Sequence, residues 1–391
     1  GNQDGNSKGD FYYEPPSGFL ALCTDNLSTP EIKLPGEHFN TVLYTGDGAV
    51  SHAITGVGFQ PDMNWVKARS FIKDHNLVDS VRGAHFRLIP NGTNAENEDA
   101  EKIISLDSDG FTTGVDGATN DNTETYASWN WKAGGAPTAD NSAGAGATPT
   151  AGSVKIDGSN LGSALAGDMP AIRLSANTTS GFSIVKYEGQ SNGATTGNFA
   201  HGLSEPPELV IIKNLVQYNW IVYSKPAGND GVLVLNNNSA FDTNSDFQDT
   251  TPSASVVYLG ASGSGNEDDV DHIAYCFHSV EGYSKVGGYE GNGNADGTFI
   301  YTGFKPAFVM FKKYDGGTDS WEIIDDKRPG YNVSDKGLFP DTNAVEASSR
   351  GGDLVSNGVK LRFVNGTTNQ SSCDYIYLAF AESPFKYSNA R

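Results

Sequence analysis

The residues best spaced for metal chemistry lie in one acidic, glycine-rich loop, YEGNGNADGTF. It places Glu290, Asn292, Asn294 and Asp296 at alternate positions and follows them with Gly297. Oxygen ligands at this spacing, with a glycine that turns the chain, resemble part of a calcium loop. The bidentate Glu that closes an EF-hand loop is missing, and an Asn/Gly hairpin turn explains the same residues. Calcium is therefore the one candidate cofactor, and the turn is the favoured interpretation.

Other patterns that could support catalysis are weak. Close carboxylate pairs occur in SLDSDGF from Ser105 and in GNEDDVDH from Gly265. A glycosidase needs two carboxylates about 5–10 Å apart across a cleft, a distance that spacing alone does not give. The seven histidines form no HExxH pattern, and no nucleophile elbow, Walker loop or dinucleotide fingerprint is present. We therefore expect a protein that is not an enzyme and has no catalytic residues.

The charge balance excludes some partners. The chain has 47 acidic and 26 basic residues and a formal charge of −21, so its surface repels nucleic acid and anionic membranes. No window approaches the roughly 20 apolar residues of a membrane span. Cys23, Cys276 and Cys373 are too far apart for a CxxC metal site. The last two lie in apolar runs, where a cysteine is usually a small buried hydrophobe.

Three markers recur in one order along the chain and define three internal repeats. A tyrosine followed by a glycine-rich turn occurs at Tyr44, Tyr187 and Tyr289. A proline, a β-rich run and a lysine six residues on occur at Pro61 and Lys67, Pro207 and Lys213, and Pro306 and Lys312. Each repeat closes with an alternating aromatic strand, YASWNW, HIAYCF or YIYLAF. We expect the lysines to protect an edge strand or to form salt bridges, and not to contact a ligand.

Alternation in the closing strand places pairs of large side chains on one face. These pairs are Trp129 and Trp131, Tyr275 and Phe277, and Leu378 and Phe380. Because every copy of a fold needs the same core, recurrence favours core packing over a surface that stacks on sugars. Short β-branched or aromatic runs bounded by turn residues predict an all-β chain of tandem antiparallel β-sandwich repeats, of jelly-roll or lectin-like type. The best helical candidate is TNAENEDAEKII, near Asn94.

The markers also predict the domain boundaries. We expect an amino-terminal arm over 1–37 and β-sandwich repeats over 38–135, 181–282 and 283–391. Residues 136–180 are expected to form a Gly/Ala/Thr-rich linker and an insertion, Ser153–Asn177, whose structure the sequence does not assign. The repeats could be arranged as beads or as a threefold-like cluster.

The motifs together resemble a known class of proteins. FYYEPPSGFLALCTDNL is similar to the carboxyl-terminal edge of SPRY-like modules in marine bacteriophage proteins. LYTGDGAVSHAITGVGFQPDMNWVK, LDSDGFTTG, HGLSEPPELVIIKN and LAFAESPFKYSNAR resemble a repeated domain in virion proteins of marine phages. The resemblance implies a non-catalytic virion component: a tail fibre, a spike or a capsid-attached fibre that contributes to host attachment.

The same resemblance implies partners and a location. It implies a homotrimer, contacts with other virion proteins, a possible host-surface glycan, and assembly in the host bacterial cytoplasm before incorporation into the virion. Neither nucleic acid nor membrane insertion is expected. Two other functions remain open: a secreted carbohydrate-binding or adhesive β-sandwich protein, and a polysaccharide-degrading enzyme. A cleft with two carboxylates would favour the enzyme, and exposed aromatics in one repeat would favour the binding protein.

Overall fold

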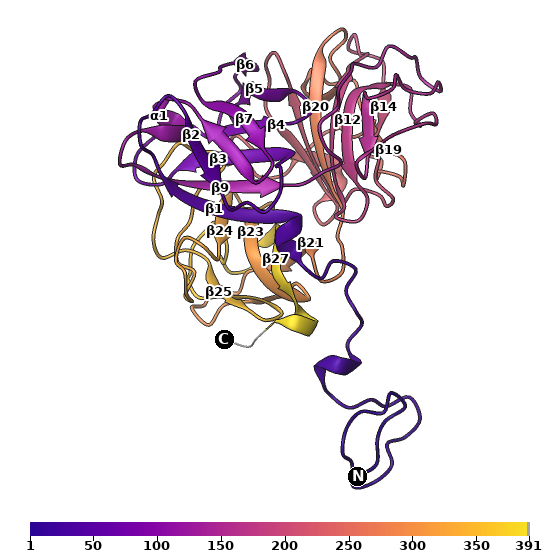
Figure 1. The fold of residues 1–391 in the computed structure, drawn as a ribbon, viewed down its shortest axis with the longest axis vertical. Coiled ribbons are helices and arrows are strands. Elements are labelled where there is room, and N and C mark those ends of the chain that lie inside the picture. The colour runs from indigo at the N-terminus through magenta and orange to yellow at the C-terminus, as the bar shows by residue number, and fades with distance from the viewer. Residues whose placement is uncertain (389–391) are drawn as a thin grey trace.

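The computed structural model describes residues 1–388 and is built almost entirely of antiparallel sheets, which confirms the all-β prediction (Figure 1). Each repeat is a sandwich of a large inner sheet and a small outer sheet. We call them unit 1 (38–135), unit 2 (181–282) and unit 3 (283–388). None of the helices among these described residues is long and apolar enough to cross a membrane.

Unit 1 has six strands in its inner sheet and three in its outer sheet. The inner order is β1 (Phe39–Thr45), β9 (Thr125–Trp131), β3 (Met63–Ala68), β4 (Asn76–Asp79), β5 (Gly83–Leu88), β6 (Asn97–Glu98). The outer order is β2 (His52–Thr55), β8 (Gly110–Thr113), β7 (Ile103–Asp107), and the one-turn helix α1 (Gly117–Asn120) precedes β9.

Unit 2 repeats this plan and gains strands from the segment before it. Its inner order is β11 (Ser159–Asn160), β10 (Val154–Ile156), β12 (Ala171–Asn177), β13 (Phe182–Glu188), β20 (Asp271–Phe277), β15 (Leu209–Asn214), β16 (Ile221–Ser224), β17 (Gly228–Val234), β18 (Asp242–Thr243). The outer pair is β14 (Gly197–Ala200) and β19 (Val256–Leu259), and α2 (Gly263–Asn266) corresponds to α1.

Unit 3 has the shortest inner sheet, in the order β21 (Ser284–Glu290), β27 (Asp374–Pro384), β23 (Phe304–Lys313), β24 (Glu322–Asp325). Its outer order is β22 (Phe299–Tyr301), β26 (Gly358–Leu361), β25 (Gly352–Val355). A long loop over 326–351 replaces the strand that follows β4 in unit 1 and β16 in unit 2. Short 3-10 turns occur at Thr24–Asn26, Pro35–Glu37 and Phe385–Tyr387.

The three units share one core, which settles their arrangement as a cluster around a common centre. One face of β9, β20 and β27 carries the six alternating residues predicted above, and all of them lie in a single hydrophobic cluster with exposures of 0–3%. The other face of each strand packs inside its own sandwich, in a separate cluster for each unit. Core packing is therefore confirmed, and the sugar-stacking alternative for these residues is wrong because no face of them reaches solvent.

The same backbone contact closes all three junctions between units. The N–H of Glu96 in unit 1 donates to Leu215 O in unit 2 (2.8 Å), and the N–H of Phe241 in unit 2 donates to Tyr314 O in unit 3 (3.1 Å). The N–H of Glu346 in unit 3 donates to Arg69 O in unit 1 (3.0 Å). A head-to-tail contact that closes after three copies forms a ring. One chain therefore builds a pseudo-threefold ring.

Equivalent aromatic N–H groups reinforce the ring. Trp220 of unit 2 donates to Ile89 O of unit 1 (3.1 Å), and Trp321 of unit 3 donates to Val234 O of unit 2 (2.8 Å). In unit 1 the equivalent residue is His75. Its Nδ1 accepts from a tryptophan indole (2.8 Å), so its Nε2–H donates to Phe339 O of unit 3 (3.0 Å).

A buried acid strengthens two of the three junctions. Asp79 of unit 1 binds the Arg82 guanidinium (2.7 Å) and accepts from the Tyr275 hydroxyl of unit 2 (2.7 Å). Asp325 of unit 3 binds Arg328 (2.6 Å) and accepts from the Trp129 indole of unit 1 (3.1 Å). At the third junction, between units 2 and 3, Ser224 stands in place of the acid, Ala227 in place of the arginine and Leu378 in place of the aromatic partner. Acid, base and aromatic partner are replaced together there, so no charge is left unpaired.

The recurring Tyr–Gly marker also has a structural reason. Tyr44, Tyr187 and Tyr289 each stack on the first aromatic residue of the closing strand, at ring distances of 5.0–5.3 Å. The glycine two residues on lets the backbone approach: a Cβ there would lie 2.1–2.3 Å from a carbonyl oxygen. Three fully buried amides, those of Asn120, Asn266 and Asn369, then accept from the N–H that follows this glycine, at 2.9–3.0 Å.

Three expectations about local structure are corrected. The segment 136–180 is not only a linker, because β10 and β12 extend the inner sheet of unit 2 and Val154 and Leu174 lie in its core. The predicted helix near Asn94 is absent; its residues include β6 and the start of β7, since this loop reaches across to unit 2. The arm over 1–37, whose motif resembles the edge of a sheet, contains turns and one isolated bridge and no strand.

Candidate functional site

A carboxylate at one fixed position supports the fold in units 1 and 2. Asp62 and Glu208 precede β3 and β15, and their backbone oxygens accept from the N–H of Ser80 and Lys225 at 2.8 Å. Their carboxylates are also occupied. The Asp62 carboxylate accepts from the Ser80 hydroxyl (2.6 Å) and the Ala133 N–H (2.7 Å). The Glu208 carboxylate accepts from the Lys225 ammonium (2.9 Å) and from the N–H of Ser279, the counterpart of Ala133 (3.0 Å).

Unit 3 lacks this hydrogen-bonded carboxylate. The equivalent backbone hydrogen bond joins Asp326 N–H to Ala307 O (2.9 Å). Ala307 therefore stands at the position of Asp62 and Glu208, and Asp326 stands at the position of Ser80 and Lys225. Asp326 Oδ1 is buried without a hydrogen-bond partner among the described residues, and Lys327 contacts only Oδ2 (3.2 Å). A second acid, Glu382, lies near the end of β27 and pairs with Lys305. The fold does not require these charges, because the other two units do without them.

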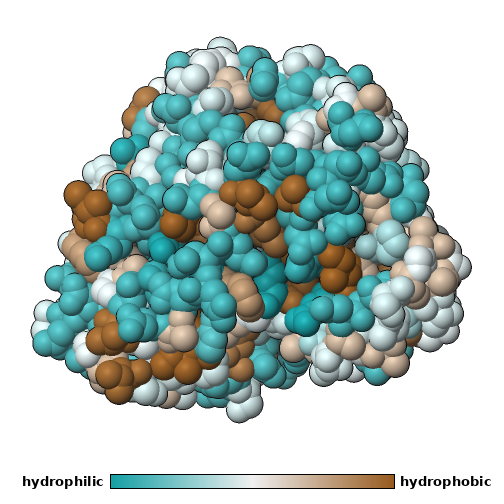
Figure 2. Space-filling model, turned by 90° about the horizontal axis from the view of Figure 1, so that it is seen from above, coloured by the Kyte–Doolittle hydropathy of each residue, from teal (hydrophilic) through white to brown (hydrophobic). Residues whose placement is uncertain are grey.

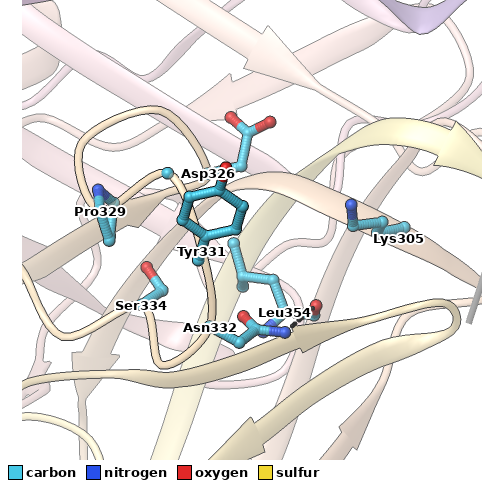
Figure 3. A pocket seen from close by; sticks show the side chains of 8 residues that line it. Lys305, Asp326, Pro329, Tyr331, Asn332, Ser334 and Leu354 are labelled. Carbon is cyan, nitrogen blue, oxygen red and sulfur yellow. Dashed lines mark hydrogen bonds between the residues drawn. The ribbon is translucent and has the colours of Figure 1, made fainter. Parts of the chain in front are cut away.

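The departure in unit 3 coincides with a pocket of about 260 Å³ (Figure 3). The loop after β24 forms one wall, and it is held to β25 because Asn332 exchanges two bonds of 2.9 Å with the backbone of Leu354. Ser334 donates to a backbone oxygen at the end of β24 (3.0 Å). Tyr331 is 85% exposed, and its ring has no packing role in the core. The pocket is therefore rigid on its backbone side and open at its aromatic edge.

The electrostatics of the pocket centre on Asp326. Burial raises its pKa to about 6, and the neighbouring Asp325 and Glu382 carboxylates act in the same direction. Lys327 opposes the shift, but its ammonium is 44% exposed and offers weak compensation. A partly buried acid with a raised pKa in a pocket is typical of a functional site. Such a group can accept from ligand hydroxyls when ionised and donate a proton when neutral.

Sequence reasoning missed this site. None of Lys305, Asp326, Tyr331 and Glu382 belongs to a recognised catalytic or binding motif. The signal that could have found them is the mismatch between repeats, because an acid stands in unit 3 where units 1 and 2 have Ser80 and Lys225. The exposed Tyr331 in the extra loop residues is a second such signal.

The predicted calcium loop runs from the end of β21 towards β22, and side-chain oxygens of three of its four predicted ligands are already engaged. Asn292 Oδ1 accepts from the Asn294 N–H (3.0 Å), and Asn294 Oδ1 accepts from the Asp296 N–H (2.9 Å). The Asp296 carboxylate pairs with Lys360 (2.8 Å), and Glu290 ends β21. Within residues 1–388, no three or more His, Cys, Asp or Glu side chains gather as metal ligands would. The geometry favours the hairpin-turn interpretation.

Both structural roles expected of the three recurring lysines, edge protection and salt bridges, are wrong. Lys67, Lys213 and Lys312 are fully buried on β3, β15 and β23, which are interior strands, and none has a carboxylate at ion-pair distance in the described chain. Their ammonium groups donate to carbonyls of residues that follow them in the chain, as Lys67 does to Ala68 O (2.7 Å) and Lys213 to Gln217 O (2.6 Å). Burial lowers the pKa of each to about 8.

Comparisons with known proteins assign a family and no activity. A family model described as Domain of unknown function (DUF7483) matches residues 34–384, which span all three units and the unit 3 pocket. The arm before Leu34 lies outside the match. No curated protein matches the chain.

Proposed function

The chain belongs to the DUF7483 family, and we propose that it is a non-catalytic structural component of a bacteriophage virion that contributes to host-surface attachment. In this proposal the ring is a rigid head and the arm joins it to another virion protein in a tail fibre, a spike or a capsid-attached fibre. The resemblance of the repeated motifs to marine phage virion proteins supports it. The observation that carries it is the arm.

The arm is folded on itself yet holds apolar side chains outward. Asp4 is buried and accepts from the backbone N–H groups of Lys8 (2.9 Å) and Ala21 (2.7 Å) and from the Asn26 amide (2.7 Å). Around this centre Tyr12 and Leu22 are 88% and 106% exposed. Figure 1 shows the arm projecting from the ring with the amino terminus at its far end. A projecting segment that exposes large apolar side chains suits attachment to a partner protein.

Virion incorporation is tested on purified particles. Mass spectrometry of the particles and gold-labelled antibody against unit 3 are expected to detect the protein on the virion surface. Its absence from particles, with the protein found free in the medium, would reject the proposal and favour the secreted carbohydrate-binding alternative. That alternative is supported by the same pocket, so the location of the protein decides between them.

Self-association is a separate part of the proposal. Because three units already close one ring, a homotrimer has to form through other surfaces, such as the arm. Figure 2 shows one face of the molecule, where apolar residues lie in separate patches among hydrophilic ones. Light scattering after gel filtration is expected to give three times 41.4 kDa for the intact chain and the mass of one shortened chain after removal of residues 1–33. An intact chain that is monomeric would reject the trimer.

The enzyme alternative has one observation in its favour, the raised pKa of Asp326 beside a second carboxylate. Incubation with bacterial surface polysaccharide and measurement of new reducing ends tests it. We expect no release above that of an Asp326→Ser variant. Release that this variant abolishes would make the protein a glycosidase.

A further inference from the structure

The unit 3 pocket has the size and chemistry of a site for one sugar ring. Its volume of about 260 Å³ is below the roughly 300–1,000 Å³ typical of larger ligand sites. Lys305, Asp326, Ser334 and Tyr331 are among the residues that line it (Figure 3), and Tyr331 is the exposed aromatic side chain among them. A pyranose presents an apolar C–H face, which packs on an aromatic ring, and hydroxyls, which donate to a carboxylate.

The charge of the pocket selects among sugars. Asp326 and Glu382 are acidic, the Lys305 ammonium is engaged by Glu382, and Lys327 contacts Asp326 from the solvent side. No basic group of the lining is free of a carboxylate partner, and the chain carries −21 overall. Carboxylated or sulfated sugars are therefore repelled, whereas the hydroxyls of an uncharged sugar can donate to the partly exposed Asp326 carboxylate.

The internal repeats supply the reason to assign this pocket a ligand. Units 1 and 2 use the same position for a satisfied structural network, so the fold can be built without an unpartnered acid. We infer that the unit 3 pocket binds one uncharged pyranose residue at the end of a surface glycan, with a single site per chain. The inference rests on the proposed attachment function and names the ligand class of that site.

The test uses the full chain and four methyl glycosides: the glucoside, galactoside, mannoside and glucuronide. Ligand-observed NMR at pH 8 is expected to show saturable, one-to-one binding of at least one of the three uncharged glycosides at millimolar concentration, with the glucuronide weaker. Tyr331→Ala and Asp326→Ser are each expected to weaken it at least about tenfold. The control is Tyr12→Ala, which removes an equally exposed tyrosine on the arm and is expected to change nothing.

Three results would overturn the inference. They are no binding of any uncharged glycoside, binding that neither pocket variant weakens while both melt no lower than the wild type, and stoichiometry of three per chain. Virion location is measured without a sugar, so failure here leaves the proposed function standing. Conversely, a secreted protein that binds sugar through Tyr331 would keep this inference and reject the virion assignment.

Discussion

Replacing Asp326 by the serine that unit 1 has at this position is expected to stabilise the protein. A functional acid that the fold does not use should cost stability where it is ionised. Asp326→Ser keeps the backbone bond to Ala307 and removes the carboxylate whose Oδ1 is buried without a partner. The ion pair that is lost, with the half-exposed Lys327, is worth less than about 1 kcal/mol.

The magnitude follows from the pKa of Asp326, about 6 in the fold against 3.8 ordinarily. Between these pH values the folded chain holds a proton that the unfolded chain has released, so the free energy of unfolding falls as pH rises through the window. At about 1.4 kcal/mol per pH unit, the ionised acid destabilises the fold by at most about 3 kcal/mol above pH 6. Asp326→Ser removes this cost, so we expect a gain of about 1–3 kcal/mol at pH 8.

Urea unfolding at pH 8 and near pH 3.5 measures the effect. The gain should largely vanish near pH 3.5, because Asp326 is then protonated in the fold and mostly protonated in the unfolded chain. The matched control is Glu208→Ala in unit 2, whose carboxylate is hydrogen-bonded and has a lowered pKa, so its removal should destabilise at pH 8. If Asp326→Ser also destabilises at pH 8, Asp326 is a structural acid and the reasoning about unit 3 is refuted.

Three further predictions concern the ring, the three buried lysines and the predicted calcium loop. Asp79→Ala leaves the Arg82 guanidinium buried without its nearest carboxylate and should cost about 3–5 kcal/mol in urea unfolding. The triple variant Asp79→Ser, Arg82→Ala, Tyr275→Leu copies the junction of units 2 and 3 and should recover most of this loss. No recovery would show that the junctions are not interchangeable. The three buried lysines have pKa values lowered to about 8, so as pH rises they lose their protons in the fold before they do in the unfolded chain. The melting temperature should therefore rise from pH 7 to pH 9.5, and a steady fall would contradict their burial. Excess calcium should leave the melting temperature unchanged because Lys360 already holds Asp296, and a calcium-dependent rise that Asp296→Ala removes would restore the calcium-loop interpretation.

Much of the fold was predictable because the sequence repeats what the fold repeats. The face shared by Trp129 and Trp131 follows from strand alternation, and its recurrence identified a core position. The shared centre was not predictable, since alternation says which side is buried and not which sheet covers it. The junction bonds, such as Glu96 to Leu215, join backbone groups far apart in sequence and leave no motif.

The lysines and the pocket show where pattern reasoning failed. A lysine at the end of a β-rich run is typical of an exposed edge, but Lys213 is buried because loop carbonyls replace its water shell. Asp326 looks like an ordinary loop acid, and only its register against Ser80 shows that the fold has no use for its charge. A departure from internal repetition was therefore more informative than any motif.

The central structural claim is that three repeats form one body around one core. Differential scanning calorimetry of residues 34–388 tests it most directly. A shared core predicts a single transition whose calorimetric and van't Hoff enthalpies agree. Two or three separate transitions, each with the enthalpy expected of about 100 residues, would contradict the closed ring and describe independent sandwiches instead.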